Sequence, residues 1–349
     1  MKVGLLLNSN NKLCSYSEKY KEILVKNNIP FILIDPNSYS LLDEIKSCSH
    51  LLFRHSQGDT DIKIYESIFN IAHRHFNIDC FPNYEMYWQY EDKIKEYYLL
   101  KSHGFPVIDT HIFWNFSHAY RFLKQTNFPV IAKLPKGAAS SNVVMVDSIE
   151  EGEKIINQIF TKGVKSKGLD SKTNLTSLRK TGGKNYFKSR IRSILFNTGI
   201  LKDKADYPEW QIQKDGILFQ KYLPDNYYDT RVVTVGNRVI AARRFVRKND
   251  FRASGGDNMD TNPDKIDPRF LEIAFTISNK LNFKTMAYDF MYGEDHTPLI
   301  SEISYSFPHW AFHSCEGYWD ESLIFHQGHN LPQIFQLTDF LQINDLQTV

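Results

Sequence analysis

The sequence lacks an apolar run long enough to cross a bilayer, because nowhere in its 349 residues do 18 apolar residues follow one another. The first apolar run, Val3 to Leu7, is ended at once by Asn8. It is too short for the core of a signal peptide and is typical of a buried first strand. We therefore expect a cytoplasmic protein without a membrane-spanning helix.

Cysteine is also scarce. Cys14, Cys48, Cys80 and Cys315 are scattered along the chain, and no two of them have the C-x-x-C spacing. This scatter argues against a structural zinc site and against a framework of disulfides. A reducing compartment such as the cytoplasm is the simplest location.

A strong net charge is absent as well, since 42 Lys and Arg oppose 40 Asp and Glu. Positive charge is instead concentrated in residues 161–204, which contain twelve Lys or Arg and two acidic residues. A basic amphipathic pattern inside this segment comprises Phe187, Lys188, Arg190, Ile191, Arg192, Ile194 and Leu195. Such a helix would contact an anionic membrane or an acidic glycan, and a solvated lid insertion is the alternative. No nucleic-acid-binding motif accompanies the charge, so nucleic acid is not an expected partner.

The length of the chain exceeds the size at which one core usually stops growing, so we expect two or three lobes. Residues 1–82 alternate apolar runs with amphipathic stretches, which predicts βαβ units and a parallel sheet. Residues 83–215 predict a linker helix and a small α+β lobe that the basic segment interrupts. Residues 216–349 predict a third lobe with an aromatic and His-rich tail. The expected fold class is α/β with α+β lobes.

Two local patterns define elements in the second and third lobes. The stretch from Asn83 to His103 has a helical pattern and is stopped by Gly104. Farther along, the apolar runs Thr230 to Val235 and Arg238 to Phe245 are separated by Gly and Asn only. A two-residue loop of this kind predicts a β-hairpin.

Lys133 interrupts the apolar strand Val130 to Leu134. A lone cation there is costly unless something anionic meets it. The small-residue loop Gly137 to Ser141 follows, and its backbone N–H groups suit a phosphate. The alternative is a strand edge with the ammonium in solvent.

Two carboxylates, Asp289 and Glu302, interrupt two apolar strands thirteen residues apart. Carboxylates on neighbouring strands repel each other unless a cation or a shared proton lies between them. Magnesium meets this requirement. Two salt-bridged core acids are the alternative.

Arginine is dense between these blocks, at positions 231, 243, 244, 247 and 252. Strand alternation places Arg243 and Arg244 on opposite faces, so at most one of them points into a given cleft. A guanidinium there would clamp a carboxylate or an acyl phosphate by bidentate hydrogen bonds. For Arg244 and Arg247 we expect a solvated basic strand.

The order of these pieces resembles the ATP-grasp superfamily, in particular the branch of glutathione synthetase and the ribosomal-protein glutamyl ligases. The matching blocks are Asp92-Lys93, Phe128 to Leu134 with its loop, Leu218 to Leu223, Asp229 to Val232, Asp250 to Gly256, Ala287 to Phe290, and Glu302 to Ser304. The sequences of several blocks, such as Phe251 to Gly255, are similar to those of ATP-grasp proteins encoded among bacterial surface-polysaccharide genes.

The resemblance implies an ATP-grasp fold, with an N-terminal parallel-sheet lobe, a small lid lobe and a C-terminal antiparallel-sheet lobe. It implies ATP and one or two Mg²⁺ ions as cofactors. The expected nucleotide contacts are Lys93, Lys133, Ser140, Ser141, Gln220, Lys221, Tyr222, Leu223 and Asp229. The expected substrate contacts are Arg231, Arg243, Arg252, Ser254, Gly255 and Gly256, and the expected catalytic residues are Arg231, Arg252 and Lys133. The expected metal ligands are Asp289, Glu302 and Ser304, although the family often has Asn where Ser304 stands.

The reaction of the family is γ-phosphoryl transfer from ATP to a carboxylate, followed by attack of an amine on the acyl phosphate. We expect a small-molecule or glycan carboxylate, such as a uronic or sugar-linked acid for a surface polysaccharide, and an amine. The aromatic stretch Pro308 to His329 suits sugar recognition, but we expect ordinary packing for Trp310 and Trp319. A peptide-tailing ligase that acts on a protein, and a nucleotide-binding scaffold or sensor without turnover, are the competing hypotheses.

Overall fold

The computed structural model describes residues 1–55, 57–137, 142–164, 212–214, 216–247, 252–253, 258–312, 314–329 and 331–348. The chain forms two compact units. Unit 1 comprises Met1–Asp109, Leu223–Arg247 and Arg252–Val349, and unit 2 comprises Thr110–Tyr222 and Lys248–Phe251. Unit 2 is therefore an insertion into the chain of unit 1.

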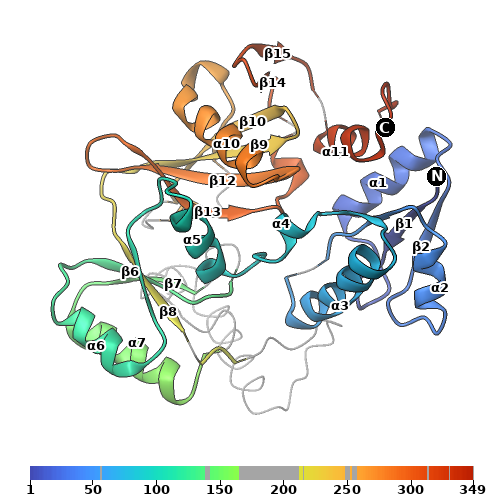
Figure 1. Cartoon of the computed structure of the whole chain (residues 1–349). Helices are drawn as coiled ribbons and strands as arrows, with labels where there is room; N and C mark the ends of the chain where they lie inside the picture. The colour runs from blue at the N-terminus through green and yellow to red at the C-terminus, as the bar shows by residue number, and fades with distance from the viewer. Residues whose placement is uncertain are drawn as a thin grey trace, which may run out of the picture. The chain divides into compact units, whose positions relative to one another are not determined.

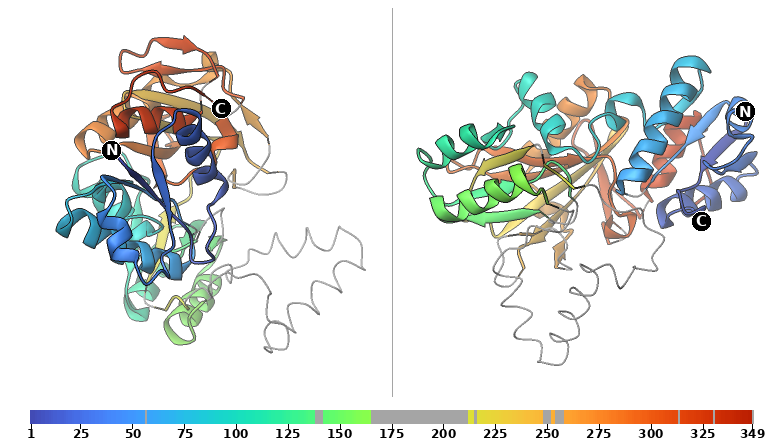
Figure 2. Two further views of the ribbon diagram at one scale, coloured as in Figure 1. Left: turned by 90° about the vertical axis from the view of Figure 1, so that its right-hand side faces the viewer. Right: turned by 90° about the horizontal axis from the view of Figure 1, so that it is seen from below.

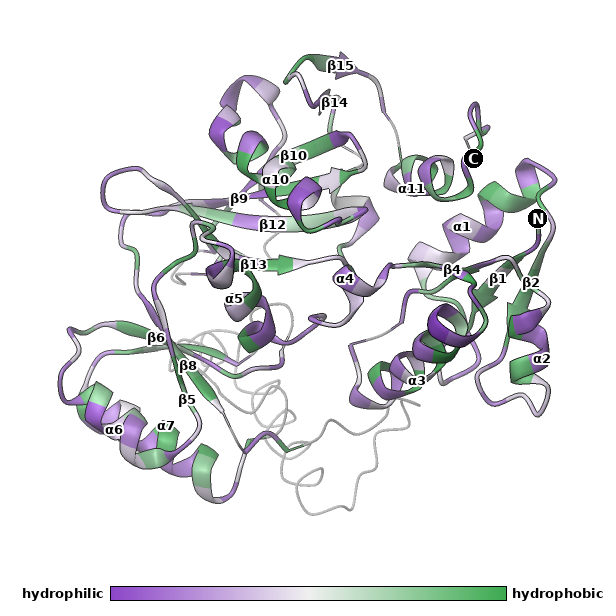
Figure 3. Cartoon of the chain, in the orientation of Figure 1, coloured by the Kyte–Doolittle hydropathy of each residue, from purple (hydrophilic) through white to green (hydrophobic). Residues whose placement is uncertain are grey.

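The N-terminal part of unit 1 is built on a parallel sheet. Its elements are β1 (Val3–Leu6), α1 (Ser15–Lys26), β2 (Phe31–Ile34), α2 (Leu41–Lys46), β3 (His50–Leu52), α3 (Asp59–His75) and β4 (Asp79–Phe81). The strand order is β2-β1-β3-β4, and all neighbouring strands are parallel. Every residue of β1 is buried, as expected of a parallel strand covered on both faces. In Figure 3 β1 and β2 are coloured as hydrophobic, whereas α3 alternates between the two colours.

The C-terminal part of unit 1 contains an antiparallel sheet. Its elements are β9 (Tyr228–Val235), β10 (Arg238–Phe245), β11 (Met259–Asp260), η1 (Pro263–Lys265), α10 (Pro268–Lys280), β12 (Thr285–Tyr292), β13 (Pro298–Ser304), η2 (His309–Phe312), β14 (Gly317–Asp320), β15 (Phe325–Gln327) and α11 (Pro332–Leu341). The strand order is β13-β12-β9-β10-β14-β15, with β11 paired to β10. The predicted hairpin is confirmed, because Val235 pairs with Arg238 and Gly236 has a φ of 56°.

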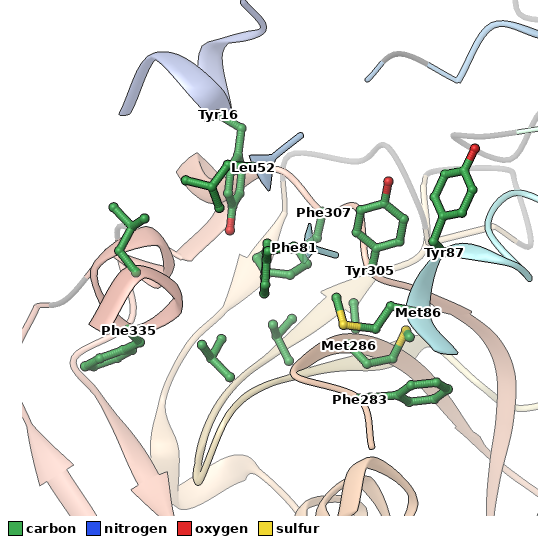
Figure 4. Close-up of a cluster of buried hydrophobic side chains, with 14 of the residues drawn as sticks. Tyr16, Leu52, Phe81, Met86, Tyr87, Phe283, Met286, Tyr305, Phe307 and Phe335 are labelled. Atoms are coloured by element: carbon green, nitrogen blue, oxygen red, sulfur yellow. The ribbon is translucent and has the colours of Figure 1, made fainter. Parts of the chain in front are cut away.

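The two parts of unit 1 share one hydrophobic core. Figure 4 shows side chains from the parallel sheet, such as Leu52 and Phe81, in the same cluster as Met286 and Phe307 of the C-terminal part. Helix α1 also packs beside α11 (Figure 1). The chain ends of unit 1 therefore stabilise each other although they are distant in sequence.

The stretch predicted as one helix forms two. Helix α4 (Tyr84–Tyr87) and helix α5 (Lys93–Ser102) are separated by a turn in which Glu91 has a φ of 56°. The Asp92 carboxylate caps α5 by accepting hydrogen bonds from the backbone N–H groups of Ile94 and Lys95. Lys93 is thereby fixed at the first position of a helix.

Unit 2 is a four-stranded antiparallel sheet covered by two helices. Its elements are β5 (Thr110–Phe113), α6 (Phe116–Leu123), β6 (Val130–Lys133), β7 (Val143–Val146), α7 (Ile149–Thr161) and β8 (Ile217–Lys221). The strand order is β5-β8-β6-β7. Helices α6 and α7 lie side by side in Figures 1 and 2, and their apolar faces bury Ala132, Phe219 and their neighbours.

Most of the predicted basic segment, from residue 165 on, lies outside the described residues, and so does its amphipathic pattern. Within the described ranges, no helix combines the length and the apolar character that crossing a membrane requires.

Candidate active site

Charged side chains lie along one face of four neighbouring strands in unit 1. On β9, Arg231 is the cross-strand partner of Asp289 on β12, and Asp229 is the partner of Arg244 on β10. Asp289 is in turn the partner of Glu302 on β13. Since cross-strand partners lie on the same face of a sheet, these five residues, three carboxylates and two guanidinium groups, form one charged row.

Asp289 is the most heavily paired carboxylate of this row. Arg231 donates to it through Nε at 2.7 Å and Nη2 at 2.8 Å, and Nη2 of Arg244 lies 2.8 Å from Oδ2. Burial by itself would raise the pKa of Asp289, but Arg231 and Arg244 together hold it below its usual value. Asp289 is therefore an ionised carboxylate in a buried position.

Arg244 is buried, with 6% of its surface exposed, so the expectation of a solvated Arg244 is wrong. It donates two hydrogen bonds to Asp229, at 2.7 and 2.6 Å, besides its contact with Asp289. The two carboxylates compensate the burial of the guanidinium, and residue type and spacing alone could not reveal this.

Arg243 points to the opposite face of β10, as strand alternation predicted. It pairs with Asp260 of β11 and lies over the ring of Tyr228, 4.9 Å from the ring centroid. Arg243 is therefore not part of the charged row on the face of Asp289.

A β-bulge places Glu302 on the same face as Asp289. The register between β12 and β13 shifts between Asp289, which opposes Glu302, and Phe290, which opposes Ile300. Ser301 is the extra residue, and its hydroxyl donates to the carbonyl of Asp289 at 3.1 Å. In a regular ladder Ser301 would oppose Asp289, and Glu302 would lie on the other face.

Glu302 forms an ion pair with Lys93, whose Nζ lies 3.2 Å from Oε1. Burial by itself would lower the pKa of Lys93, but Glu302, Glu96 and Glu91 together raise it above its usual value. Glu96 also accepts a hydrogen bond from the backbone N–H of Ile303 at 3.3 Å. Lys93 therefore lies among three carboxylates on the side of the row formed by Glu302.

Sequence reasoning missed Glu91 and Glu96. Burial raises the pKa of Glu91 to about 7, although Lys93 and Gln57 lower it. Gln57 donates to Glu91 at 3.0 Å, and Glu91 has the left-handed φ noted above, which costs about 1 kcal/mol in a non-glycine residue. Glu96 lies three residues after Lys93 on α5, a spacing that places two side chains on the same helix face and could have revealed it.

The residues of the row suit a magnesium ion that binds together with a phosphate. Asp289 and Glu302 supply hard oxygen donors from adjacent positions, and the Ser304 hydroxyl donates to the carbonyl of Ser306 at 3.1 Å. Among the described residues, no three His, Cys, Asp or Glu side chains are grouped so that they could hold a metal ion. Magnesium is commonly bound by one or two carboxylates plus substrate phosphates, so this donor set fits the ion.

Lys133 belongs to unit 2. It is buried on β6 opposite Leu218, on the sheet face away from α6 and α7, and Gln220 lies on the same face beside Ile131. The Gln220 amide donates to the hydroxyl of Thr110 at 3.1 Å. Lys133 is therefore not a solvated edge residue.

The remaining predicted positions have different environments. Lys221 is exposed, Tyr222 and Arg252 are half-buried, and Leu223 is buried. The predicted residues Ser140, Ser141, Ser254, Gly255 and Gly256 lie outside the described residues. The structure thus brings together Lys93, Asp229, Arg231, Asp289 and Glu302 in unit 1 and describes Lys133 and Gln220 within unit 2.

The aromatic tail is partly described. Trp319 is 9% exposed and packs against Phe325, with ring centroids 4.9 Å apart, which confirms the expected packing role. His326 lies on the adjacent strand and pairs with Asp320 at 2.6 Å. His313 lies outside the described residues, as does the side chain of Trp310.

Comparison with known proteins identifies the fold. Residues 202–311 match the model of the RimK-like ATP-grasp domain. None of the curated proteins matches the chain. Three solved structures are similar along most of their length.

The first is a RimK domain ATP-grasp protein from Sphaerobacter thermophilus, with 12% identity, a TM-score of 0.55 and coverage of 98% of this chain and 100% of that chain. The second is an N5-carboxyaminoimidazole synthase from Aspergillus clavatus, with 12% identity, a TM-score of 0.56 and coverage of 99% and 77%. The third is the D-cycloserine synthetase DcsG, with 13% identity, a TM-score of 0.53 and coverage of 88% and 92%. The chain has the ATP-grasp fold, as the order of its motifs predicted.

Proposed function

We propose that the protein is an ATP- and magnesium-dependent ligase that joins a carboxylate to an amine. The observation that carries this proposal is the charged row in unit 1 together with Lys93 beside it, because Arg231 pairs with Asp289 and Lys93 pairs with the adjacent Glu302. Cations for phosphate oxygens and carboxylates for a metal are what phosphoryl transfer from ATP requires. The names of the three structural relatives are consistent with the same class of reaction, since one is a synthetase, one is a synthase and one is an ATP-grasp protein.

The reaction has two steps. A carboxylate oxygen of the acid takes the γ-phosphoryl group, and ADP leaves. The amine nitrogen then attacks the acyl carbon, phosphate leaves, and the amide forms as the nitrogen loses a proton. No nucleophilic side chain is needed, because the catalytic effect comes from positioning and charge neutralisation.

The residues of the row have separate tasks in this proposal. Lys93 and Arg231 bind phosphate oxygens, and Arg231 also neutralises charge on the group in transfer. Asp289 and Glu302 hold magnesium, with Ser304 as a third oxygen donor. The ion, when bound, neutralises charge on the β- and γ-phosphates. In unit 2, Lys133 and the loop that contains Ser140 and Ser141 contribute further phosphate contacts.

The remaining roles follow the resemblance. The chain from Gln220 to Leu223 binds adenine, and Asp229 binds the ribose or orients Arg244. Arg252 and the segment from Ser254 to Gly256 face the acyl substrate, and the resemblance implies the same role for Arg243. The position of Arg243 on the other face of β10, paired with Asp260, makes it the weakest member of this set.

The proposal also extends to the identity of the carboxylate substrate. We infer a uronic or sugar-linked acid, because several blocks are similar to ATP-grasp proteins of surface-polysaccharide clusters. The four cysteines are free thiols, which suits the cytoplasm, where ATP is available. A peptide-tailing ligase is the rival, because the order of the blocks also resembles that of the ribosomal-protein glutamyl ligases.

The test is release of ADP by the purified full-length protein with ATP, Mg²⁺, and panels of acids and amines. One panel holds uronic acids, another holds peptides that end in glutamate, and both are offered with amino acids and amino sugars. Formation of an amide, identified by mass spectrometry, together with one ADP for each amide supports the ligase. Nucleotide binding without ADP release on every panel would indicate a scaffold or sensor instead.

A matched variant links the activity to the row. Asp289→Asn is expected to lower turnover at least about 100-fold, because it removes a metal ligand charge. Asp339→Asn is the control, since Asp339 pairs with Arg238 at the surface. Equal turnover in the Asp289→Asn variant and the wild type would refute the assignment of the site.

A further inference from the structure

Asp289 has two guanidinium partners in different environments. Arg231 occupies both carboxylate oxygens, at 2.7 and 2.8 Å, and Arg244 makes an additional contact at 2.8 Å with Oδ2. A single carboxylate thus accepts three N–H groups from two cations. One bidentate arginine would already pair the charge, so the second arginine calls for an explanation.

Arg244 is held more firmly than Arg231. Its guanidinium lies between two carboxylates and is 7% exposed, because it also donates two hydrogen bonds to Asp229. The Arg231 side chain is 17% exposed, and it donates both of its hydrogen bonds to one carboxylate, that of Asp289. Moving Arg244 would leave two buried carboxylates short of a cation, whereas moving Arg231 would leave Asp289 still paired with Arg244.

We propose that Arg231 is an exchangeable partner of Asp289 and that Arg244 is a fixed positioning residue. This inference rests on the proposed function. When the phosphates of the nucleotide enter, Arg231 releases Asp289 and pairs with a phosphate oxygen. Arg244 stays in place and keeps the Asp289 carboxylate paired and oriented, with oxygens that Arg231 no longer occupies.

The exchange balances charge at each stage. Without nucleotide, the guanidinium of Arg231 occupies the donor atoms of Asp289 and competes with any divalent cation. With nucleotide, phosphate oxygens compete for the guanidinium, so each ligand lowers the cost of binding the other. Nucleotide and metal are therefore expected to bind with positive coupling, and Arg231 is the residue that couples them.

The first test measures Mn²⁺ binding without nucleotide, by electron paramagnetic resonance of the full-length protein. Arg231→Met is expected to bind Mn²⁺ about tenfold more tightly than the wild type, because one competing cation is gone, equivalent to about 1.4 kcal/mol. The same variant is expected to bind a non-hydrolysable ATP analogue about tenfold more weakly. These opposite signs distinguish the exchange from a purely structural role, which would weaken both.

Arg238→Met is the matched control. Arg238 has a similar exposed fraction, 20%, and a similar ion pair, with Asp339 at 3.1 Å. It lies on the β9–β10 hairpin and is outside the candidate site, so both affinities should equal those of the wild type. An unchanged or weaker Mn²⁺ affinity in Arg231→Met would overturn the proposal, and so would a tighter Mn²⁺ affinity in Arg238→Met.

The second test compares the two arginines by thermal unfolding without ligands. Arg244→Met should lower Tm by several degrees more than Arg231→Met, since it leaves Asp229 and Asp289 to share one cation. Arg244→Lys keeps the charge and replaces Arg244→Met in the comparison if that variant does not fold. Its Tm should also be lower than that of Arg231→Met. Equal losses for the two positions would contradict the division into a fixed and an exchangeable partner.

Failure of the proposed exchange gives a different result from failure of the proposed function. If the wild type binds no ATP analogue, the proposed function fails. The Mn²⁺ and Tm comparisons need no turnover, so they decide the roles of Arg231 and Arg244 independently.

Discussion

At the scale of single residues, Glu91 makes the stability of the fold depend on pH. Burial raises the pKa of this carboxyl from 4.5 to about 7 in the folded state, so between these values the folded chain binds more protons than the unfolded chain. Stability is therefore lost as the pH rises from about 4.5 through 7. Glu91→Gln removes this loss, because its neutral amide does not ionise.

From pH 5 to pH 8, the unfolding free energy of the wild type should thus fall by roughly 1–3 kcal/mol relative to that of Glu91→Gln. Urea unfolding at the two pH values measures it. Glu85→Gln, in the neighbouring helix α4, is the control and should show no such shift. A difference that is the same at both pH values would show that Glu91 ionises normally in the folded chain.

Lys133 gives a second prediction at the residue scale. Lys133→Met keeps the length of the buried side chain and removes its charge, so the sheet of unit 2 should persist while phosphate binding is lost. Turnover measured by ADP release should fall about 100-fold or more, with little change in the circular dichroism spectrum. Lys124→Met, at an exposed position after α6, should retain full turnover. Retention of activity by Lys133→Met would remove Lys133 from the site.

Residue type and order predicted much of the charged row. Asp289 and Glu302 stood out because each interrupts an apolar strand, where a charge needs a partner, and Lys93 stood out only through the family resemblance. Arg244 did not stand out, because strand alternation gives the face of a side chain and not its depth. Glu91 was missed because its burial is a tertiary property, and so is its hydrogen bond from Gln57, a residue that is distant in sequence.

Helix α5 carries a prediction at the element scale. Asp92→Ala removes the hydrogen bonds to the N–H groups of Ile94 and Lys95 and should lower stability by about 1 kcal/mol. It should also weaken binding of an ATP analogue several-fold, because the start of the helix fixes Lys93. Fluorescence titration and urea unfolding measure the two effects.

Asn115→Ala is the matched control for this cap. Asn115 caps α6 through a hydrogen bond from the His118 N–H at 3.0 Å. Its loss should lower stability by a similar amount without changing nucleotide affinity. If both variants bind the analogue as the wild type does, the cap of α5 has no role in positioning Lys93.

At the element scale, the strands with strong local patterns were predicted closely. The pairs β9 with β10 and β12 with β13 follow from apolar runs and from the Gly-Asn turn. The bulge at Ser301 was not predictable from alternation, which would have placed Glu302 on the face of Ile300. In hindsight the three-residue spacing of buried Ile300 and Ile303 is the signal, since a regular strand alternates with a period of two.

At the scale of the whole molecule, contacts between α1 and α11 stabilise the fold. The hydroxyl groups of Tyr16 and Tyr20 on α1 both donate to Gln336 on α11, at 2.8 and 2.5 Å. Gln336→Met leaves both buried hydroxyls without this acceptor and should lower the unfolding free energy by about 2–3 kcal/mol. Chemical denaturation measures it, and Gln327→Met, at an exposed position of β15, is the control. A loss no larger than that of the control would show that the two hydroxyls find other acceptors.

Sequence patterns could not predict which elements share a core. Periodicity is a local signal, and it identified the parallel sheet and the antiparallel sheet as separate lobes. The core that unites them contains residues such as Leu52 and Met286, more than 200 positions apart (Figure 4). The tail was expected to pack, but β14, β15 and α11 have short or mixed patterns that did not indicate regular structure.

The insertion of unit 2 into unit 1 has a consequence for the order of events during translation. Residues 110–222 hold all of unit 2 except the short segment 248–251, so most of unit 2 can fold while the C-terminal part of unit 1 is still being synthesised. The parallel sheet emerges earlier, yet its partner α11 is made only after unit 2. The nascent N-terminal segment therefore exposes apolar surface until α11 has been made, which makes it a candidate client for chaperones that bind at the ribosomal exit tunnel.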